Sequence, residues 1–162
     1  MRKTARVDPR PLLMRLPADE VPASLMARTS FLLHRAGMGL MHGFAEALVK
    51  LHLRPHHYHV LQVLSLGRPA SQLDIAEPLG FDRNKMVNIV DELEALGLAR
   101  REPNPEDRRA KAVVLTSAGR TALKAAEEME RKIEEQYFAP LTAQQRSQFH
   151  ELLHALVSAK RE

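Results

Sequence analysis

Residues 73–119 read LDIAEPLGFDRNKMVNIVDELEALGLARREPNPEDRRAKAVVLTSAG, and the order of helical periods and breakers in this stretch decides the fold. Apolar residues recur every three or four positions up to Gly80 and again between Asp82 and Leu96, which predicts two consecutive helices. Gly80 suits the end of the first helix, Asp82 the cap of the second, and Gly97 its end. Two helices joined by so short a turn form a helix-turn-helix.

The chain before this motif predicts its scaffold. Arg54-Pro55 starts a helix that runs to about Leu66, because proline is favoured in the first helical turn. Ser71 caps the first helix of the helix-turn-helix. Pro78 within that helix is expected to end it or tighten it early, since proline lacks a backbone donor and disfavours helical geometry in the preceding residue.

The chain after the motif changes to short segments with alternation and branched residues. Residues 98–103 (LARREP) and 111–116 (KAVVLT) predict a β-hairpin whose polar tip includes Asp107, Arg108 and Arg109. A projecting arginine is the side chain that a narrow minor groove attracts. The hairpin therefore predicts a second DNA contact beside the helix-turn-helix, with ordinary surface charge as the alternative.

The helix predicted over 82–96 has an apolar face and a polar face. The first half of the polar face offers amide and cationic side chains, namely those of Arg83, Asn84, Lys85 and Asn88. Amides pair with adenine edges, and cations pair with guanine or phosphate. Asp91, Glu92 and Glu94 crowd the second half, where they would repel phosphates, so we expect the N-terminal end to enter the major groove. A solvated surface face is the alternative.

The composition agrees with a polyanionic partner without requiring one. The chain of 162 residues carries a formal net charge of +4 and has no cysteine. The lack of cysteine excludes disulfides, thiolate metal sites and thiol-based redox switches. No apolar run approaches the roughly 20 residues needed to cross a membrane, and the first residues lack the apolar stretch of a secretion signal. We therefore expect a cytoplasmic protein with no membrane partner.

The segment quoted above resembles the winged helix-turn-helix of the MarR family of bacterial transcription regulators, with DELEALGLARR leading into the hairpin and PEDRRAKAVVLTSAG closing it. The flanking helices extend the resemblance to residues 24–158. It implies a mainly α fold with a small β-hairpin wing: a winged helix-turn-helix DNA-binding domain at 53–116 and helical dimerisation regions at 22–52 and 117–162. Residues 1–21, with three prolines and five basic side chains, are expected to form a loosely packed arm.

The resemblance also implies roles for individual residues. The recognition helix, 82–96, enters the major groove and the wing, 99–115, enters the minor groove. Asp107 braces the wing, Arg109 enters the minor groove and Arg108 contacts phosphate. The expected contacts are completed by Lys111 together with Arg83, Asn84, Lys85 and Asn88. The expected partner is double-stranded DNA with a palindromic operator, and the expected activity is that of a repressor without cofactor or catalysis; activation is the alternative.

Members of the family are homodimers held together by their terminal helices. By this resemblance, three apolar stripes of the sequence are expected to form the dimer interface. Residues 25–40, 129–137 and 149–157 would bury one another across a two-fold axis. The first stripe lies in a helix expected from about Ser24 to Lys50, whose glycines predict either close packing or a kink. A dimeric adaptor that does not bind DNA would share these stripes and stays as an alternative.

Many relatives bind small aromatic acids or phenols between the DNA-binding lobe and the dimer helices. The candidate residues for such an effector are His34, Arg35, Tyr58 and His59, which combine a cation, donors and rings at the predicted junction. Ligand binding there would shift the spacing of the recognition helices and release the DNA.

HELLH, at 150–154, has the pattern of a zinc peptidase. His150 and His154 would lie one turn apart on a helix, with Glu151 as general base. A peptidase needs a third protein ligand further on, and no histidine follows His154. A zinc hydrolase is therefore an alternative that we expect to fail.

A second histidine group consists of His52, His56, His57 and His59. His52 and His56 could chelate a metal on one continuous helix, but Pro55 predicts a helix boundary between them. Ordinary, partly buried histidines are the favoured interpretation, and metal sensing is the alternative.

Overall fold

The structure is a computed structural model that describes residues 11–67, 70–104 and 111–159. In chain order the elements are α1 (Leu12–Arg15), the 3-10 helix η1 (Ala18–Glu20), α2 (Ala23–Met26), α3 (Thr29–Leu48), the 3-10 helix η2 (Val49–Leu51), α4 (Pro55–Ser65), α5 (Gln72–Leu79), α6 (Arg83–Ala95), β1 (Ala99–Pro103), β2 (Lys111–Leu115), α7 (Ser117–Tyr137) and α8 (Ala143–Ser158). The fold is mainly α with a two-stranded hairpin, which confirms the fold class predicted from the sequence.

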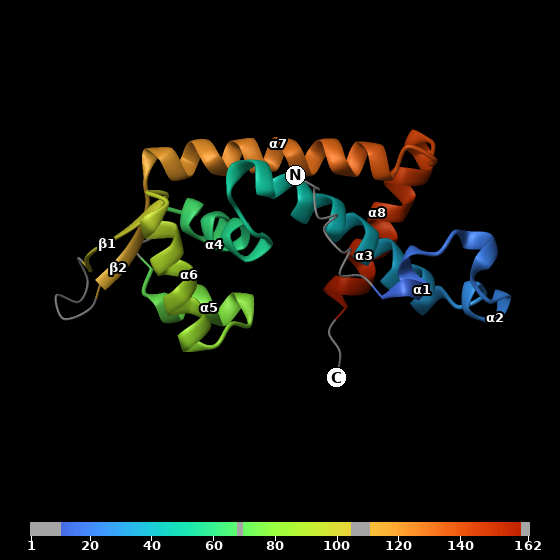
Figure 1. Cartoon of the computed structure of the whole chain (residues 1–162), viewed down its shortest axis with the longest axis horizontal. Helices are drawn as coiled ribbons and strands as arrows, with labels where there is room; N and C mark the ends of the chain where they lie inside the picture. The colour runs from blue at the N-terminus through green and yellow to red at the C-terminus, as the bar shows by residue number, and fades with distance from the viewer. Residues whose placement is uncertain (1–10, 68–69, 105–110, 160–162) are drawn as a thin grey trace, which may run out of the picture.

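Helix α7 runs along the length of the molecule and joins its two ends (Figure 1). The lobe formed by α4, α5, α6 and the hairpin lies under the N-terminal part of α7. Helix α8 lies at the opposite end, α3 runs between the two, and α1 and α2 lie beyond α3. None of the helices within the described residues is long and apolar enough to span a bilayer.

The lobe has a continuous apolar core, which each of its helices reaches with one face. The largest of the fully buried side chains are those of Leu48, Leu53, Tyr58, Val60, Leu61, Ile75, Met86, Val90, Leu93 and Val113. Helix α6 buries four side chains along one stripe and leaves the opposite side to solvent. The helical period in the sequence therefore identified this stripe, although Leu96, which the same period places on the apolar side, is 41% exposed.

The helix ends are set by the capping residues that the sequence predicted. Ser71 Oγ accepts the backbone N–H of Asp74 at 3.3 Å, and the Asp74 carboxylate accepts the backbone N–H of Ser71 at 2.8 Å. Asp82 Oδ1 accepts the backbone N–H of Lys85 at 2.9 Å. These side chains satisfy donors that the first turn of a helix leaves unpaired.

The expectation that Pro78 ends α5 early is wrong. The helix continues through Pro78 to Leu79 and ends at Gly80, which has φ of +63°. The backbone N–H groups of Phe81 and Gly80 donate to the carbonyls of Ala76 (3.0 Å) and Glu77 (3.2 Å), so the last carbonyls are satisfied. A proline in the last turn removes only one intrahelical bond, and this C-terminal arrangement holds the turn in place.

The hairpin is antiparallel, with Ala99 opposite Leu115 and Pro103 opposite Lys111. Ala70 adds an isolated bridge to its edge, because the backbone N–H of Val113 donates to the Ala70 carbonyl at 2.9 Å. The hairpin is thus attached to the chain just before α5 as well as to α6.

Gly119 fixes the start of α7 against the turn between α6 and β1. A Cβ at this position would lie 2.0 Å from the carbonyl oxygen of Leu98, so only glycine fits. Thr116 Oγ1 accepts the N–H of Gly119 at 2.9 Å and donates to the carbonyl of Gly97 at 2.7 Å. Helix α7 is therefore rigidly connected to the lobe that it spans.

The N-terminal part differs from the expectation in two ways. The helix expected over 24–50 is interrupted: α2 ends at Met26, Arg28 is extended (φ −101°, ψ 118°), and α3 starts at Thr29. Residues 11–21 of the expected loose arm form α1 and η1, and Val21 is buried; residues 1–10 lie outside the described residues. Arg35 of α3 holds this segment.

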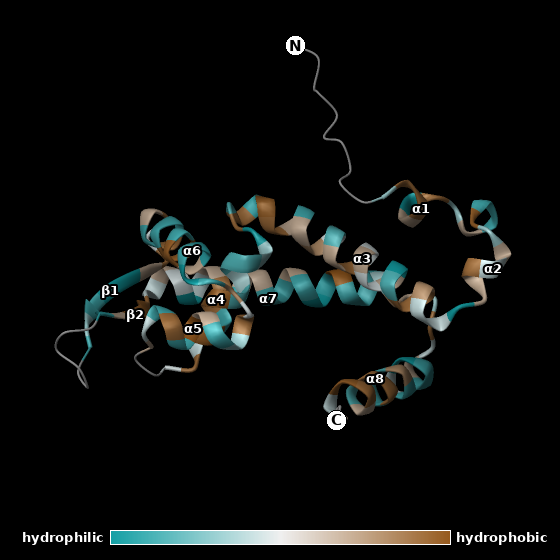
Figure 2. Ribbon diagram, turned by 90° about the horizontal axis from the view of Figure 1, so that it is seen from below, coloured by the Kyte–Doolittle hydropathy of each residue, from teal (hydrophilic) through white to brown (hydrophobic). Residues whose placement is uncertain are grey.

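Close packing, rather than a kink, explains a glycine of α3. A Cβ on Gly39 would lie 2.8 Å from the hydroxyl of Tyr137, and one on Gly43 would lie 3.5 Å from the Ile133 side chain. Helix α3 therefore approaches α7 closely along this line. Apolar residues also run along α8 (Figure 2), although none of its side chains is buried.

Candidate nucleic-acid interface

The outward face of α6 carries the predicted recognition residues. The exposed side chains near its start are those of Arg83, Asn84, Lys85 and Asn88. The opposite face is fixed in the core by Met86, Ile89, Val90 and Leu93. Because the core fixes the rotation of the helix, the polar set must face outward, as a major-groove helix requires.

Lys85 is less free than its exposure suggests. Its ammonium nitrogen lies 3.9 Å from the centroid of the Phe81 ring, a cation–π contact. Phe81 follows the turn glycine and packs partly into the core. The sequence prediction did not include Phe81, whose position directly before the Asp82 cap is the signal that could have indicated it.

A hollow of about 460 Å³ connects the recognition helix with the wing. It lies between α5, α6 and β2, and its lining includes Ser71, Gln72, Leu73, Arg83 and Lys111. Two of the predicted DNA contacts, Arg83 and Lys111, are thus brought to one surface from segments that are distant in sequence. The other predicted wing residues, Asp107, Arg108 and Arg109, lie outside the described residues.

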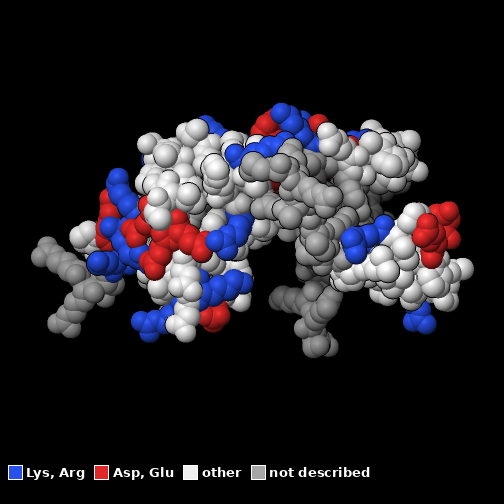
Figure 3. All heavy atoms as spheres, in the orientation of Figure 1, with Lys and Arg blue, Asp and Glu red and all other residues white. Residues whose placement is uncertain are grey.

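The carboxylates in the acidic second half of α6 are paired with arginines of neighbouring segments. Asp91 and Glu94 both pair with Arg101 of β1, and the Asp91 Oδ1 to Arg101 Nη1 distance is 2.7 Å. Glu92 pairs on the other side with Arg54, at 3.0 Å from its Nη2. Figure 3 shows Lys and Arg atoms gathered around the Asp and Glu atoms of this lobe. The three carboxylates therefore connect α6 to its neighbours.

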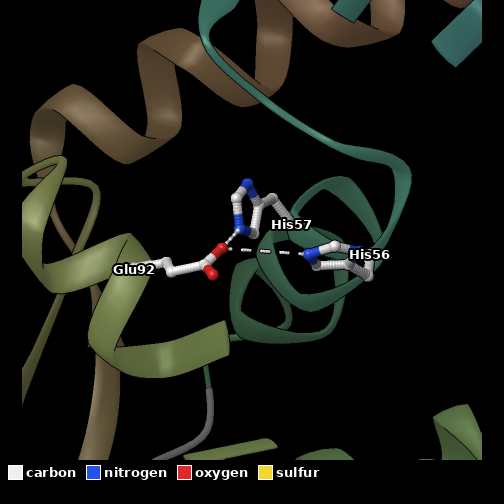
Figure 4. A group of neighbouring side chains, drawn as sticks. All are labelled: His56, His57 and Glu92. Carbon is white, nitrogen blue, oxygen red and sulfur yellow. Dashed lines mark hydrogen bonds and ion pairs between the residues drawn. The ribbon is translucent and has the colours of Figure 1, made fainter. Parts of the chain in front are cut away.

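Glu92 also meets the histidines at the start of α4 (Figure 4). Its Oε2 lies 2.7 Å from Nε2 of the buried His57 and 4.0 Å from Nε2 of His56. Burial and the neighbouring His57 lower the pKa of His56 to about 4. Burial also lowers the pKa of His57, and the hydrogen bond that its ring donates to Glu92 opposes this by raising it. The His57 hydrogen bond in turn lowers the pKa of Glu92.

The ligand atoms of His56, His57 and Glu92 lie within 4.8 Å of one another, so a metal site must be considered. The protonation of His57 argues against it. The backbone N–H of Arg54 donates to His57 Nδ1 at 3.3 Å, which places the proton of the neutral ring on Nε2, facing Glu92. A metal bound to Nε2 would require the ring proton to be on Nδ1. There it would face the backbone N–H of Arg54, and the hydrogen bond between them would be lost. The group is therefore a hydrogen-bonded clamp between α4 and α6.

Another histidine of the sequence group, His52, lies apart from this clamp. It follows η2, is exposed and has a left-handed backbone conformation (φ 56°).

HELLH lies on an exposed part of α8. The rings of His150 and His154 stack with centroids 6.3 Å apart, and Glu151 accepts a hydrogen bond from Ser147 at 3.2 Å. Among the described residues, no third imidazole or carboxylate completes a group with them. The hydrolase alternative has no support in this geometry.

Three of the four candidate effector residues, Arg35, Tyr58 and His59, make contacts within the fold. Arg35 donates to the carbonyls of Leu13 (2.7 Å) and Leu16, and so holds the N-terminal segment. Tyr58 is buried and donates to Glu130, and burial together with that carboxylate raises its pKa. His59 is half-buried beside Tyr58, with ring centroids 5.7 Å apart.

His34 lines a groove with a volume of about 560 Å³. Its walls are Leu33, Gly37, Met38, Met41, His42 and Ala45 of α3, together with Pro55 at the start of α4. Sequence reasoning missed these residues because their common face is apolar, as the face of a packed helix would be.

Comparisons with known proteins agree with this geometry. The model of the MarR family matches residues 53–110. The HTH-type transcriptional repressor Rv2887 of Mycobacterium tuberculosis is 28% identical over 141 residues, covering 87% of this chain and 97% of that protein. The structure of Rv2887 in complex with DNA matches with a TM-score of 0.72 at 29% identity, over 82% of this chain and 99% of that chain.

The transcriptional repressor CouR is similar in two states. Bound to a 23-mer DNA duplex it matches with a TM-score of 0.73 at 27% identity, over 83% of this chain and 95% of that chain. CouR of Rhodococcus jostii RHA1 bound to p-coumaroyl-CoA matches with a TM-score of 0.69 at 27% identity, over 85% and 97% of the two chains. The recognition face, the hairpin and these matches show a winged helix-turn-helix of the MarR family at residues 53–110, within a chain whose whole fold is similar to that of DNA-binding transcriptional repressors.

Proposed function

We propose that the chain is a homodimeric, sequence-specific repressor that places α6 in the major groove and the wing, residues 99–115, in the minor groove. The observation that carries the proposal is the polar start of α6, exposed on a helix whose other face is buried in the core. Amides at 84 and 88 would contact base edges, and Arg83 and Lys111 would contact the backbone. Rv2887 and CouR, which share the fold, are both bound to DNA in their structures.

A second chain would cover the apolar residues that α3, α7 and α8 leave exposed. The exposed large side chains on these helices are Leu32, Leu33, Met41, Tyr137, Leu152, Leu156 and Val157. Monomeric proteins rarely expose so many apolar side chains in one region. Two copies related by a two-fold axis would present two recognition helices to a palindromic operator.

A small aromatic or phenolic effector would occupy the α3 groove and release the DNA. The groove is lined mostly by apolar side chains, with His34 and His42 supplying ring nitrogens, and it lies where α3 meets the start of α4. CouR binds an aromatic CoA thioester. A ligand wedged against Pro55 would move α4, and α4 is joined to α6 through the Glu92 clamp.

Selection of genomic fragments by the purified protein, followed by sequencing, tests the central part of the proposal. We expect enrichment of a palindrome and a steep loss of affinity as salt rises, because cationic side chains displace counterions from phosphates. Absence of any enriched fragment at low ionic strength would favour the dimeric adaptor instead.

Arg109→Ala tests the wing. We expect the affinity for the selected duplex to fall by roughly 1 to 3 kcal/mol, as for a lost groove contact. Arg100→Ala is the matched control, because Arg100 is exposed on β1 and pairs with Glu102 of the same strand. Equal effects of the two variants would remove the specific role of Arg109.

Gly37→Leu tests the effector groove. Nothing lies within 4 Å of a Cβ at Gly37, so a leucine would fill the groove without disturbing the core. The variant is expected to bind the selected duplex like the wild type but to resist release by aromatic acids and aromatic CoA thioesters. Gly37→Ala, which adds one methyl group, should still respond. Loss of dimerisation in Gly37→Leu would instead assign the groove to the subunit interface.

A further inference from the structure

Arg101 is the residue at which the three parts of the winged helix-turn-helix meet. It lies on β1, and its side chain is only 18% exposed. Its backbone N–H donates to Glu94 Oε1 at 2.7 Å, and its Nη1 pairs with Asp91 Oδ1 at 2.7 Å and with the Glu94 carboxylate. The guanidinium therefore binds α6 through two carboxylates.

The same guanidinium also reaches α5. With its amide oxygen turned toward Arg101, Gln72 accepts from Nε at 3.0 Å and from Nη2 at 3.2 Å. One planar fork thus holds the first helix of the helix-turn-helix, the recognition helix and the wing at once. A lysine could not do so, because its ammonium is a single point donor.

The wing needs such a brace because its link to α6 is a glycine turn. Gly97 has φ of +70° and leads directly from α6 into β1. Arg101, four residues after Gly97, connects β1 to α6 through its ion pairs with Asp91 and Glu94. Arg101 is paired in the hairpin with Val113, two residues along β2 from Lys111, so the brace acts close to the cationic base of the wing.

We propose that Arg101 is a positioning residue for DNA binding: it does not touch the DNA, but it fixes the angle between the recognition helix and the wing so that both grooves can be engaged together. A preset angle lowers the ordering that binding would otherwise require. The proposal rests on the proposed DNA-binding mode. It assigns a role in that mode to the acidic half of α6, whose Asp91 and Glu94 hold the wing.

The chain offers a matched control in the neighbouring residue. Arg100 precedes Arg101 on the same strand, and its side chain points to the other face, where it is 63% exposed and pairs with Glu102. Arg100→Gln and Arg101→Gln remove the same charge from the same strand. Their difference therefore isolates the brace from general electrostatic attraction to DNA.

The test measures the affinity of full-length variants for the genomic duplex that the wild type selects, by fluorescence anisotropy. Arg101→Gln is expected to weaken binding about tenfold more than Arg100→Gln, the size of coupling usual for contacting groups. Arg101→Lys, which keeps the charge, is expected to fall between them and serves as the test if Arg101→Gln does not fold. Equal affinities of the Arg100 and Arg101 variants would overturn the proposal.

A double-mutant cycle separates positioning from simple destabilisation. In the wild type, Lys111→Gln on the wing and Asn84→Ala on α6 should each weaken binding. In the Arg101→Gln background the penalty of Lys111→Gln should nearly vanish, because the wing is already displaced, whereas that of Asn84→Ala should persist. The proposal is contradicted if Lys111→Gln weakens binding as much in the Arg101→Gln background as in the wild type. It is also contradicted if Lys111→Gln does not weaken binding in the wild type. Failure of the wild type to bind any duplex would instead remove the proposed function itself.

Discussion

The two ends of α7 differ in how completely their apolar side chains are covered. At the N-terminal end the lobe encloses its leucines and valines, and α6 alone buries four side chains. At the other end α8 buries none, and Leu152 (71% exposed) and Val157 (77%) face solvent. The lobe buries most of its large apolar side chains in a closed core. The terminal helices also carry apolar side chains, but no further layer of helices among the described residues covers them. The lobe is thus closed by its own side chains, whereas the terminal helices would need the second chain proposed above to cover theirs.

Truncation of a leucine in the lobe should give the largest effect. Leu61 is fully buried, so Leu61→Ala is expected to lower the free energy of unfolding by about 2 to 5 kcal/mol. Leu66→Ala, at the C-terminal cap of α4 and 76% exposed, is the control and should change it by less than about 0.5 kcal/mol. Urea denaturation followed by circular dichroism measures both. Similar losses for the two variants would mean that the lobe is not the closed core described above.

The exposed leucines of α8 should behave in the opposite way. Leu152→Glu is expected to weaken self-association by about 2 to 3 kcal/mol, the value of burying one leucine, while the lobe stays folded. Leu66→Glu makes the same substitution at a similarly exposed leucine of the lobe and should leave association unchanged. Sedimentation equilibrium compares the two. A dimer unaffected by Leu152→Glu would assign the interface to another surface.

How much the sequence could predict also differs between the two regions. In the lobe, each helix is bounded by a local signal: Ser71 and Asp82 cap, and Gly80 and Gly97 terminate. In the N-terminal region the break at Arg28 has only a weak local signal. Thr29 and Ser30, which follow it, are weak helix formers, but the Arg28 side chain does not cap the new helix. Arg35 holds the preceding chain at Leu13, a tertiary contact that the sequence does not reveal.

The candidate site shows the same limit. The recognition face followed from periodicity, because burial of one face of α6 determines the other. The partners of Asp91, Glu92 and Glu94 did not, since they come from β1 and α4 and a charge run in a sequence does not reveal its partners. The partners of two candidate effector residues could not be predicted for the same reason: Tyr58 and Arg35 donate to groups that are distant in the sequence.

Acid should destabilise the lobe through the clamp between α4 and α6, with a smaller effect than the core substitution. Burial first, and then His57, Arg54 and Lys85, lower the pKa of His56 from 6.5 to about 4, and Glu92 opposes them. The unfolded chain therefore binds more protons below about pH 6.5, so stability is full above that pH and falls as the pH drops toward 4. We expect a loss on the order of 1 kcal/mol by about pH 5, reduced in His56→Gln. If the urea concentration at the midpoint of unfolding does not change between about pH 8 and pH 5, protonation of this histidine group does not destabilise the lobe, and the prediction is wrong.

The mass of the protein–DNA complex tests the central claim most directly. Sedimentation velocity of the wild-type protein with the palindromic duplex that it selects should give a complex of two chains per duplex. The same experiment with Leu152→Glu should give a much weaker complex, although the lobe that carries the recognition helix stays folded. A tight complex with one chain per duplex, or no complex with any selected fragment, would contradict the account.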